Sequence, residues 1–158
     1  MSDSYRAGET YWRAVEPIWD KVSIYDGEIV FLTQFRELDP NVGHLFAAHW
    51  CNSEVCNGGF WQLFYNSTGV LAPEALVAFT ALELDSFADC LREAMSLMGN
   101  PYPRDRSARV EILEKDEEAG GVLEETLNDF SDRYFAARRL GYDHFALAAD
   151  AFARRYSL

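Results

Sequence analysis

The sequence predicts an all-α fold, a single compact multi-helix domain of about six to eight helices. Apolar residues recur at intervals of three and four along most of the chain, and helix start and stop signals separate these stretches. No segment shows the period of two that is typical of a strand. The 158 residues, 49% of them hydrophobic, suffice for one core, and no linker divides them. We therefore expect one domain over residues 1–158, with residues 1–8 flexible.

The first part of the chain contains three predicted helices. Residues 12–22 carry apolar side chains at helical spacing, and Pro17 should either kink this helix or begin a new one. A second apolar repeat spans residues 29–38. Asp39-Pro40 then supplies an N-cap and a first-turn proline for a helix that runs through Trp50.

Four further helices are predicted in the second half of the chain. Pro73 begins a short one, and an apolar stripe over residues 84–98 ends at Gly99-Asn100-Pro101, a typical stop signal. Two more stripes, over residues 123–134 and 145–156, repeat at three- and four-residue intervals.

The most distinctive stretch is residues 54–69, which read EVCNGGFWQLFYNSTG. Two adjacent glycines accept positive φ, so we expect a sharp reversal there before an apolar helical segment. The side-chain amides in this segment are expected to satisfy the open backbone groups of the Gly-Gly turn. The predicted role is structural, and its residues are Asn57, Gly58, Gly59, Phe60, Gln62, Asn66 and Gly69.

This pattern resembles a bacterial domain-of-unknown-function family typified by a DNA-mimic protein that sequesters a DNA-binding repressor. The resemblance is carried by Glu54-Val55, Asn57-Gly58-Gly59-Phe60, Gln62, Asn66-Ser67 and Gly69, and weaker similarity covers most of the chain. The sequence departs from the family pattern at Cys56, where a second Asn is usual, and at the bulky Trp61. The resemblance implies a role in transcription regulation through a protein partner. No binding residue is carried over, because the mimic's contact surface has no motif that aligns.

Charge is the second informative feature. The chain has 26 acidic and 14 basic residues, a net charge of −12, and residues 111–132 hold nine acids against Lys115 alone. Such a surface repels nucleic acid and favours a basic protein partner. Three rows of carboxylates at helical spacing are the predicted partner-binding residues: Asp85, Asp89 and Glu93; Glu111, Glu114 and Glu118; and Glu125, Asp129 and Asp132.

Charge density limits what one helix can imitate. A single helix over residues 111–132 would extend at most about 33 Å, a length over which duplex DNA presents about 19 phosphates. The nine carboxylates of this segment fall short of that number. Mimicry therefore requires several rows. A two-fold homodimer is one way to continue them, since many repressors read half-sites about 34 Å apart.

Three functions are compatible with these features. The first is a DNA mimic that binds the DNA-binding surface of a helix-turn-helix regulator or a nucleoid protein. The second is an immunity-type inhibitor of a basic toxin. The third is an uncharacterised enzyme or metal-binding protein, since His44, His49, Cys51 and Cys56 are potential ligands, although their spacing matches no familiar site. The acidic faces could also be solvated surface only. We expect no enzyme activity, no cofactor and no metal.

The cellular compartment is predicted from the signal and membrane segments that the sequence lacks. The first ten residues have neither the basic start nor the apolar core of a signal peptide, and no apolar run approaches about 18 residues. Three cysteines without a C-x-x-C pair argue against a disulfide framework. We expect a cytoplasmic protein that does not enter a membrane.

Overall fold

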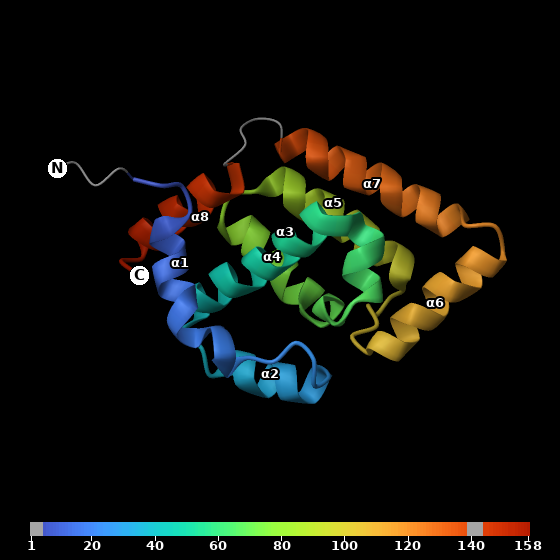
Figure 1. The fold of residues 1–158 in the computed structure, drawn as a ribbon, viewed down its shortest axis with the longest axis horizontal. Coiled ribbons are helices and arrows are strands. Elements are labelled where there is room, and N and C mark those ends of the chain that lie inside the picture. Colours follow the sequence, from blue (N-terminus) through green and yellow to red (C-terminus); the bar gives the residue numbers. More distant parts are fainter. Residues whose placement is uncertain (1–4, 139–143) are drawn as a thin grey trace.

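A computed structural model describes residues 5–138 and 144–158 of the chain (Figure 1). Within these residues it contains eight α-helices, two 3-10 helices and no strand, which confirms the all-α prediction. In chain order the elements are α1 (Glu9–Val15), η1 (Glu16–Lys21), α2 (Glu28–Arg36), α3 (Pro40–Tyr65), η2 (Ser67–Leu71), α4 (Ala72–Ala81), α5 (Asp85–Met98), α6 (Arg106–Glu118), α7 (Val122–Arg138) and α8 (His144–Arg155).

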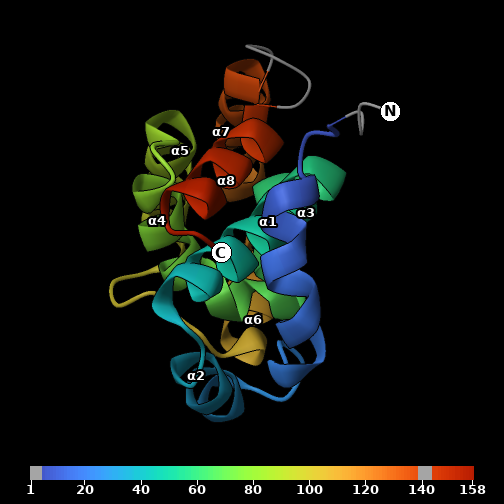
Figure 2. The ribbon, with the colours of Figure 1, turned by 90° about the vertical axis from the view of Figure 1, so that its left-hand side faces the viewer.

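Helix α3 is the centre of the fold. It contacts α1, α4, α6, α7 and α8, and its buried side chains include Leu45, Phe46, Phe60 and Phe64. In Figure 1, α1 and α8 lie to the left of α3, α2 lies below it, and α6 and α7 form the right-hand and upper right edge. Figure 2 shows α8 running between α1 and the α4–α5 pair. None of the helices described is long and apolar enough to span a bilayer.

The predicted start and stop signals act as expected. Asp39 caps α3, because its carboxylate accepts hydrogen bonds from the backbone N–H groups of Asn41 at 2.9 Å and Val42 at 3.2 Å. Pro17 lies in the first turn of η1, so it begins a new helix rather than kinking the old one. Gly99 follows α5 with φ 135°, a conformation that L side chains rarely adopt.

Residues 111–132 do not form one helix. Helix α6 ends at Glu118, α7 begins at Val122, and Gly120 and Gly121 between them have φ values of 114° and 76°. The two helices meet at a corner at the right-hand edge of Figure 1, so their acidic residues do not continue along a common axis. The sequence did not predict α6 as a separate helix, because only one of its 13 residues, Leu113, is a buried hydrophobic residue.

The N-terminal segment is attached to α8 through a buried carboxylate. Asp150 accepts hydrogen bonds from the N–H groups of Gly8 at 2.7 Å and Tyr11 at 2.8 Å, and from the Tyr5 hydroxyl. Residues 1–4 of the segment predicted to be flexible lie outside the described residues, and its flexibility stays a prediction.

The Gly-Gly motif bends α3. Gly58 (φ −151°, ψ 17°) and Gly59 (φ 74°, ψ −172°) are non-helical. The bend is sharp, since the Asn66 amide donates a hydrogen bond to Glu54, twelve residues earlier, whereas twelve residues of straight helix would extend about 18 Å. A Cβ on Gly58 would overlap the Gln62 side chain.

The backbone N–H group of Phe60, at the bend, is not satisfied by a side-chain amide of the motif as predicted. The Phe60 N–H donates to Ser131 Oγ of α7 at 2.9 Å, and Ser131 Oγ donates to the Leu127 carbonyl at 2.9 Å. Asn66 does not serve the turn, because its amide is engaged by Glu54. A hydroxyl from another helix therefore satisfies the Phe60 N–H, and the role predicted for Gln62 stays a prediction.

Replacing Gly59 with alanine is expected to lower the free energy of unfolding by about 2 to 4 kcal/mol. The backbone conformation is nearly exclusive to glycine, and the added Cβ would lie 2.7 Å from Ser131 Oγ. Urea denaturation measures the change. Gly120→Ala is the matched control, because φ there is also positive but no atom lies within 4 Å of the new Cβ. Equal losses in the two variants would show that the contact with Ser131 is unimportant.

Candidate functional site

All nine predicted partner-binding carboxylates are exposed, and they lie on three helices. Helix α5 carries Asp85, Asp89 and Glu93, α6 carries Glu111, Glu114 and Glu118, and α7 carries Glu125, Asp129 and Asp132. Helix α7 packs against both α5 and α6, so the three rows belong to neighbouring helices (Figure 1).

Three of these carboxylates are paired with cations. Asp89 pairs with Arg92 at 2.5 Å, and Glu93 pairs with Arg133 of α7 at 3.0 Å, so two of the three acids in the α5 row are neutralised. On α6, Lys115 Nζ lies 2.7 Å from Glu111 and lowers the pKa of that carboxyl. The α5 row is therefore the weaker candidate for an anionic contact surface.

The five predicted partner-binding acids of α6 and α7 that form no ion pair make up an exposed anionic surface. We call it the α6–α7 acidic surface, and its members are Glu114, Glu118, Glu125, Asp129 and Asp132. None of them forms a salt bridge with a Lys or Arg among residues 5–138 and 144–158, and Glu118 has only a longer-range interaction with Lys115. Their charge is therefore available to a partner.

Asp116 fixes the corner between the two helices of this surface. Its carboxylate accepts from the backbone N–H groups of Leu123 at 2.9 Å and Glu124 at 3.0 Å, and its carbonyl accepts from Gly121 N at 2.8 Å. A carboxylate on the first free N–H groups of a helix satisfies them and interacts favourably with the helix dipole. Asp116 therefore has a structural role, although the sequence alone places it among the acids of the segment.

Ser131 connects the acidic surface to the motif. It is buried against the α3 bend, and its neighbours Asp129 and Asp132 are exposed. Through the Phe60–Ser131 hydrogen bond, the bend of α3 sets the position of the helix that displays these acids. The motif residues thus support the surface without belonging to it.

Arg109 is a key structural residue that the sequence did not reveal. Its side chain is fully buried, and its guanidinium donates to the carbonyls of Phe64 at 2.9 Å, Asn66 at 2.9 Å, Pro103 at 3.3 Å and Arg104. These bonds connect α6 to the end of α3 and to the preceding loop. The only feature of the sequence that could have pointed to Arg109 is the presence of three arginines within six residues, at positions 104, 106 and 109.

The last glycine of the motif makes room for this guanidinium. A Cβ on Gly69 would lie 2.7 Å from Arg109 Nε and 2.8 Å from Arg109 Cζ. The Gly69 carbonyl accepts a hydrogen bond of 2.7 Å from the Tyr102 hydroxyl. Gly69 therefore permits close packing of α6 against the α3–η2 junction.

The four potential metal ligands are not brought together. The described residues contain no group of three or more His, Cys, Asp or Glu side chains that could hold a metal ion. His49 Nδ1 forms a 3.0 Å hydrogen bond with the Tyr11 hydroxyl, and the His44 ring packs edge-on to Phe152. Burial lowers the pKa of both histidines and raises the pKa of the Cys51 and Cys56 thiols. The metal-binding hypothesis has no geometric support in this part of the chain.

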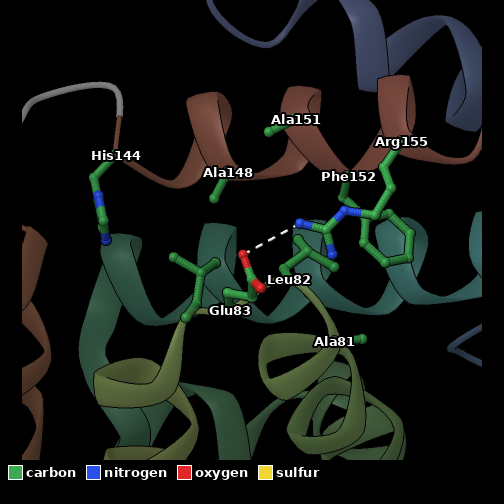
Figure 3. A pocket seen from close by; sticks show the side chains of 9 residues that line it. Ala81, Leu82, Glu83, His144, Ala148, Ala151, Phe152 and Arg155 are labelled. Atoms are coloured by element: carbon green, nitrogen blue, oxygen red, sulfur yellow. Dashed lines mark hydrogen bonds and ion pairs between the residues drawn. The ribbon is translucent and has the colours of Figure 1, made fainter.

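A pocket of about 160 Å³ lies between α8 and the turn that joins α4 to α5 (Figure 3). Its charged residues, Glu83 and Arg155, form an ion pair of 3.2 Å at one end, and His144 lies at the other. The ring of His144 packs edge-on to Phe87. In Figure 1, α8 lies away from the corner between α6 and α7.

Comparison with known proteins supports the resemblance at the level of the family. No curated protein and no solved structure matches the chain. The family model described as DMP19-like protein matches residues 36–156, a region that includes the bent α3 and all nine predicted partner-binding acids. The match spans more than three quarters of the sequence, and the chain therefore belongs to the DMP19-like protein family.

Proposed function

We propose that this protein is a cytoplasmic bacterial DNA mimic that regulates transcription. In this proposal, the α6–α7 acidic surface occupies the DNA-binding surface of a basic partner, either a helix-turn-helix regulator or a nucleoid protein. Membership of the DMP19-like family is compatible with this role. The observation that carries the proposal is a set of five exposed carboxylates that form no salt bridge among the described residues.

Electrostatics favour these five residues over the α5 row. An anionic group that is already paired offers a partner little net charge, and exposed pairs contribute only about 0 to 1 kcal/mol to stability. Unpaired carboxylates on adjacent helices raise the local negative potential, which attracts a basic surface and repels DNA. The protein then acts by binding alone, without catalysis, cofactor or direct contact with nucleic acid.

Geometry favours two copies of the protein per partner. Helices α6 and α7 have 13 and 17 residues, which correspond to about 20 and 26 Å. Duplex DNA presents about 12 phosphates over the shorter of these lengths, more than the five carboxylates of one acidic surface. A homodimer with two such surfaces would match a repressor that reads two half-sites about 34 Å apart.

A pull-down from bacterial lysate tests the proposal with two variants of equal net charge. The acidic-surface variant carries Glu118→Gln, Glu125→Gln and Asp129→Asn. The control variant carries Glu9→Gln, Glu16→Gln and Glu37→Gln, which are exposed and lie outside α5, α6 and α7. Each set changes the formal net charge from −12 to −9.

The wild type and the control variant are expected to recover a DNA-binding protein at about 50 mM salt and to lose it at about 200 mM. The acidic-surface variant is expected to recover none. Recovery of a secreted toxin by the wild type would instead support the immunity function. Identical recovery by all three proteins would mean that the α6–α7 acidic surface is solvated surface only.

A further inference from the structure

A second candidate site lies away from the corner between α6 and α7. It is a pocket of about 270 Å³ between η1, the following loop and α3, lined by Trp19, Asp20, Val22, Ser23, Ile24, Tyr25, Gln34 and Trp50. All of these residues except Trp50 precede residue 36, where the family match begins. In Figure 1 the α1–α2 connection is remote from the α6–α7 corner. The acidic-surface proposal makes no use of this pocket.

The lining combines aromatic rings with one free carboxylate. Trp19 and Trp50 stack with ring centroids 4.8 Å apart and an interplanar angle of 13°. Tyr25 also lines the pocket, and 71% of its surface is exposed to solvent. Asp20 is exposed and has no cationic partner among the described residues, and no Lys or Arg lines the pocket. Aromatic faces beside an unpaired carboxylate attract an organic cation.

The pocket wall is held in place by hydrogen bonds within the loop. Ser23 N donates to Gln34 Oε1 of α2 at 2.7 Å, Ser23 Oγ donates to Asp26 Oδ2 at 2.6 Å, and Tyr25 N donates to Ser23 Oγ at 3.1 Å. These bonds fix the backbone on both sides of Ile24. A preformed wall reduces the entropy that ligand binding must overcome.

Contacts with other aromatic rings hold Trp19 of the stacked pair in place. Trp19 packs against Trp12 at 5.3 Å, against Phe46 at 5.7 Å and edge-on to His49 at 5.4 Å. Burial lowers the pKa of His49 and so favours the neutral imidazole beside the Trp19 ring. The environment of the pocket is therefore compatible with a bound cation.

An adjoining pocket gives room for the remainder of a ligand. It has a volume of about 220 Å³ and shares Tyr25 and Trp50 with the first pocket. Its other lining residues include Glu54 and Arg106. Arg106 is bound through Nε to the Tyr65 carbonyl at 2.9 Å and lies over the Tyr65 ring, so it faces the adjoining pocket rather than the aromatic one.

We propose that the pocket lined by Trp19, Asp20, Tyr25 and Trp50 binds a quaternary alkylammonium group, carried either by a small compound or by a trimethylated lysine side chain. Asp20 supplies the counter-charge, and Tyr25 and Trp50 supply the π faces. This site is independent of DNA mimicry, and its test does not involve the regulator.

Isothermal titration with choline and with its uncharged carbon analogue, 3,3-dimethylbutan-1-ol, separates cation recognition from apolar burial. We expect choline to bind at least about tenfold more tightly than the alcohol, because only the cation interacts with π faces and carboxylate. Trimethylated N-acetyl-lysine methylamide forms the second arm. Tighter binding of choline points to a free small molecule, and tighter binding of the lysine derivative points to a side chain.

Two variants and one control locate the site. Asp20→Asn and Tyr25→Ala change exposed side chains, so both variants should fold normally. For whichever cation binds the wild type more tightly, affinity should fall at least about threefold in Asp20→Asn and at least about tenfold in Tyr25→Ala. Glu16→Gln removes an equal charge from the same 3-10 helix outside the pocket and should leave affinity unchanged. The proposal is overturned if neither cation binds saturably, if the alcohol binds equally well, or if Glu16→Gln weakens binding as much as Asp20→Asn.

Discussion

Replacing Arg109 with methionine is expected to lower the free energy of unfolding by about 3 to 5 kcal/mol. Methionine fills much of the same volume but donates no hydrogen bond. The carbonyls of Phe64, Asn66, Pro103 and Arg104 would lose a buried donor, and each unsatisfied buried acceptor costs about 1 to 3 kcal/mol before relaxation. Chemical denaturation followed by circular dichroism measures the loss.

Two further variants make the Arg109 prediction specific. Arg109→Lys retains the charge but not the planar fork, so it should recover only part of the stability. Arg92→Met removes an exposed arginine whose pair with Asp89 lies in solvent, and it should change stability by less than about 1 kcal/mol. If Arg109→Met lowered the free energy of unfolding no more than Arg92→Met does, the Arg109 guanidinium would not stabilise the α3–α6 junction.

The acidic-surface variant is expected to bind the regulator about 10- to 150-fold more weakly than the wild type does. Each removed carboxylate eliminates one exposed charge contact worth about 0.5 to 1 kcal/mol, and three such losses add to about 1.5 to 3 kcal/mol. Association rates should fall as well, since long-range attraction steers oppositely charged proteins together. Surface plasmon resonance with the purified regulator measures both quantities.

The control variant separates local charge from net charge. Because it has the same formal charge as the acidic-surface variant, it should lose less than about threefold in affinity. Thermal unfolding of both variants should stay close to that of the wild type, since all six substituted side chains are exposed. Equal weakening by the two variants would indicate that affinity depends on overall charge and that the α6–α7 acidic surface has no special role.

The helices were predictable because their signals are local. Asp39 caps α3 through the N–H groups of residues two and three positions later, and Gly99 terminates the helix that it follows. The spacing of carboxylates likewise predicted which of them are exposed. Helix α6 was missed as an element of its own because it packs through few apolar residues and its attachment depends on Arg109.

The supporting interactions of the site were not predictable, since they join residues distant in sequence. Ser131 satisfies a backbone N–H 71 positions earlier, and Arg109 reaches a carbonyl 45 positions earlier. The pairing of Glu93 with Arg133 spans 40 positions and reduces the charge of a row that looked fully anionic in sequence. The packing of α7 against α5 is needed to show that Glu93 is paired, whereas the pairs of Asp89 and Glu111 are with residues three and four positions away.

The central claim is that the α6–α7 acidic surface competes with DNA for a regulator, and a gel-shift competition tests it most directly. The regulator is first bound to its own labelled duplex, and the protein is then added at low and at high salt. We predict that the wild type and the control variant release free duplex, and that the acidic-surface variant does not. A slower-migrating complex containing regulator, duplex and wild-type protein together would contradict the claim, because a DNA mimic and DNA cannot occupy one surface at the same time.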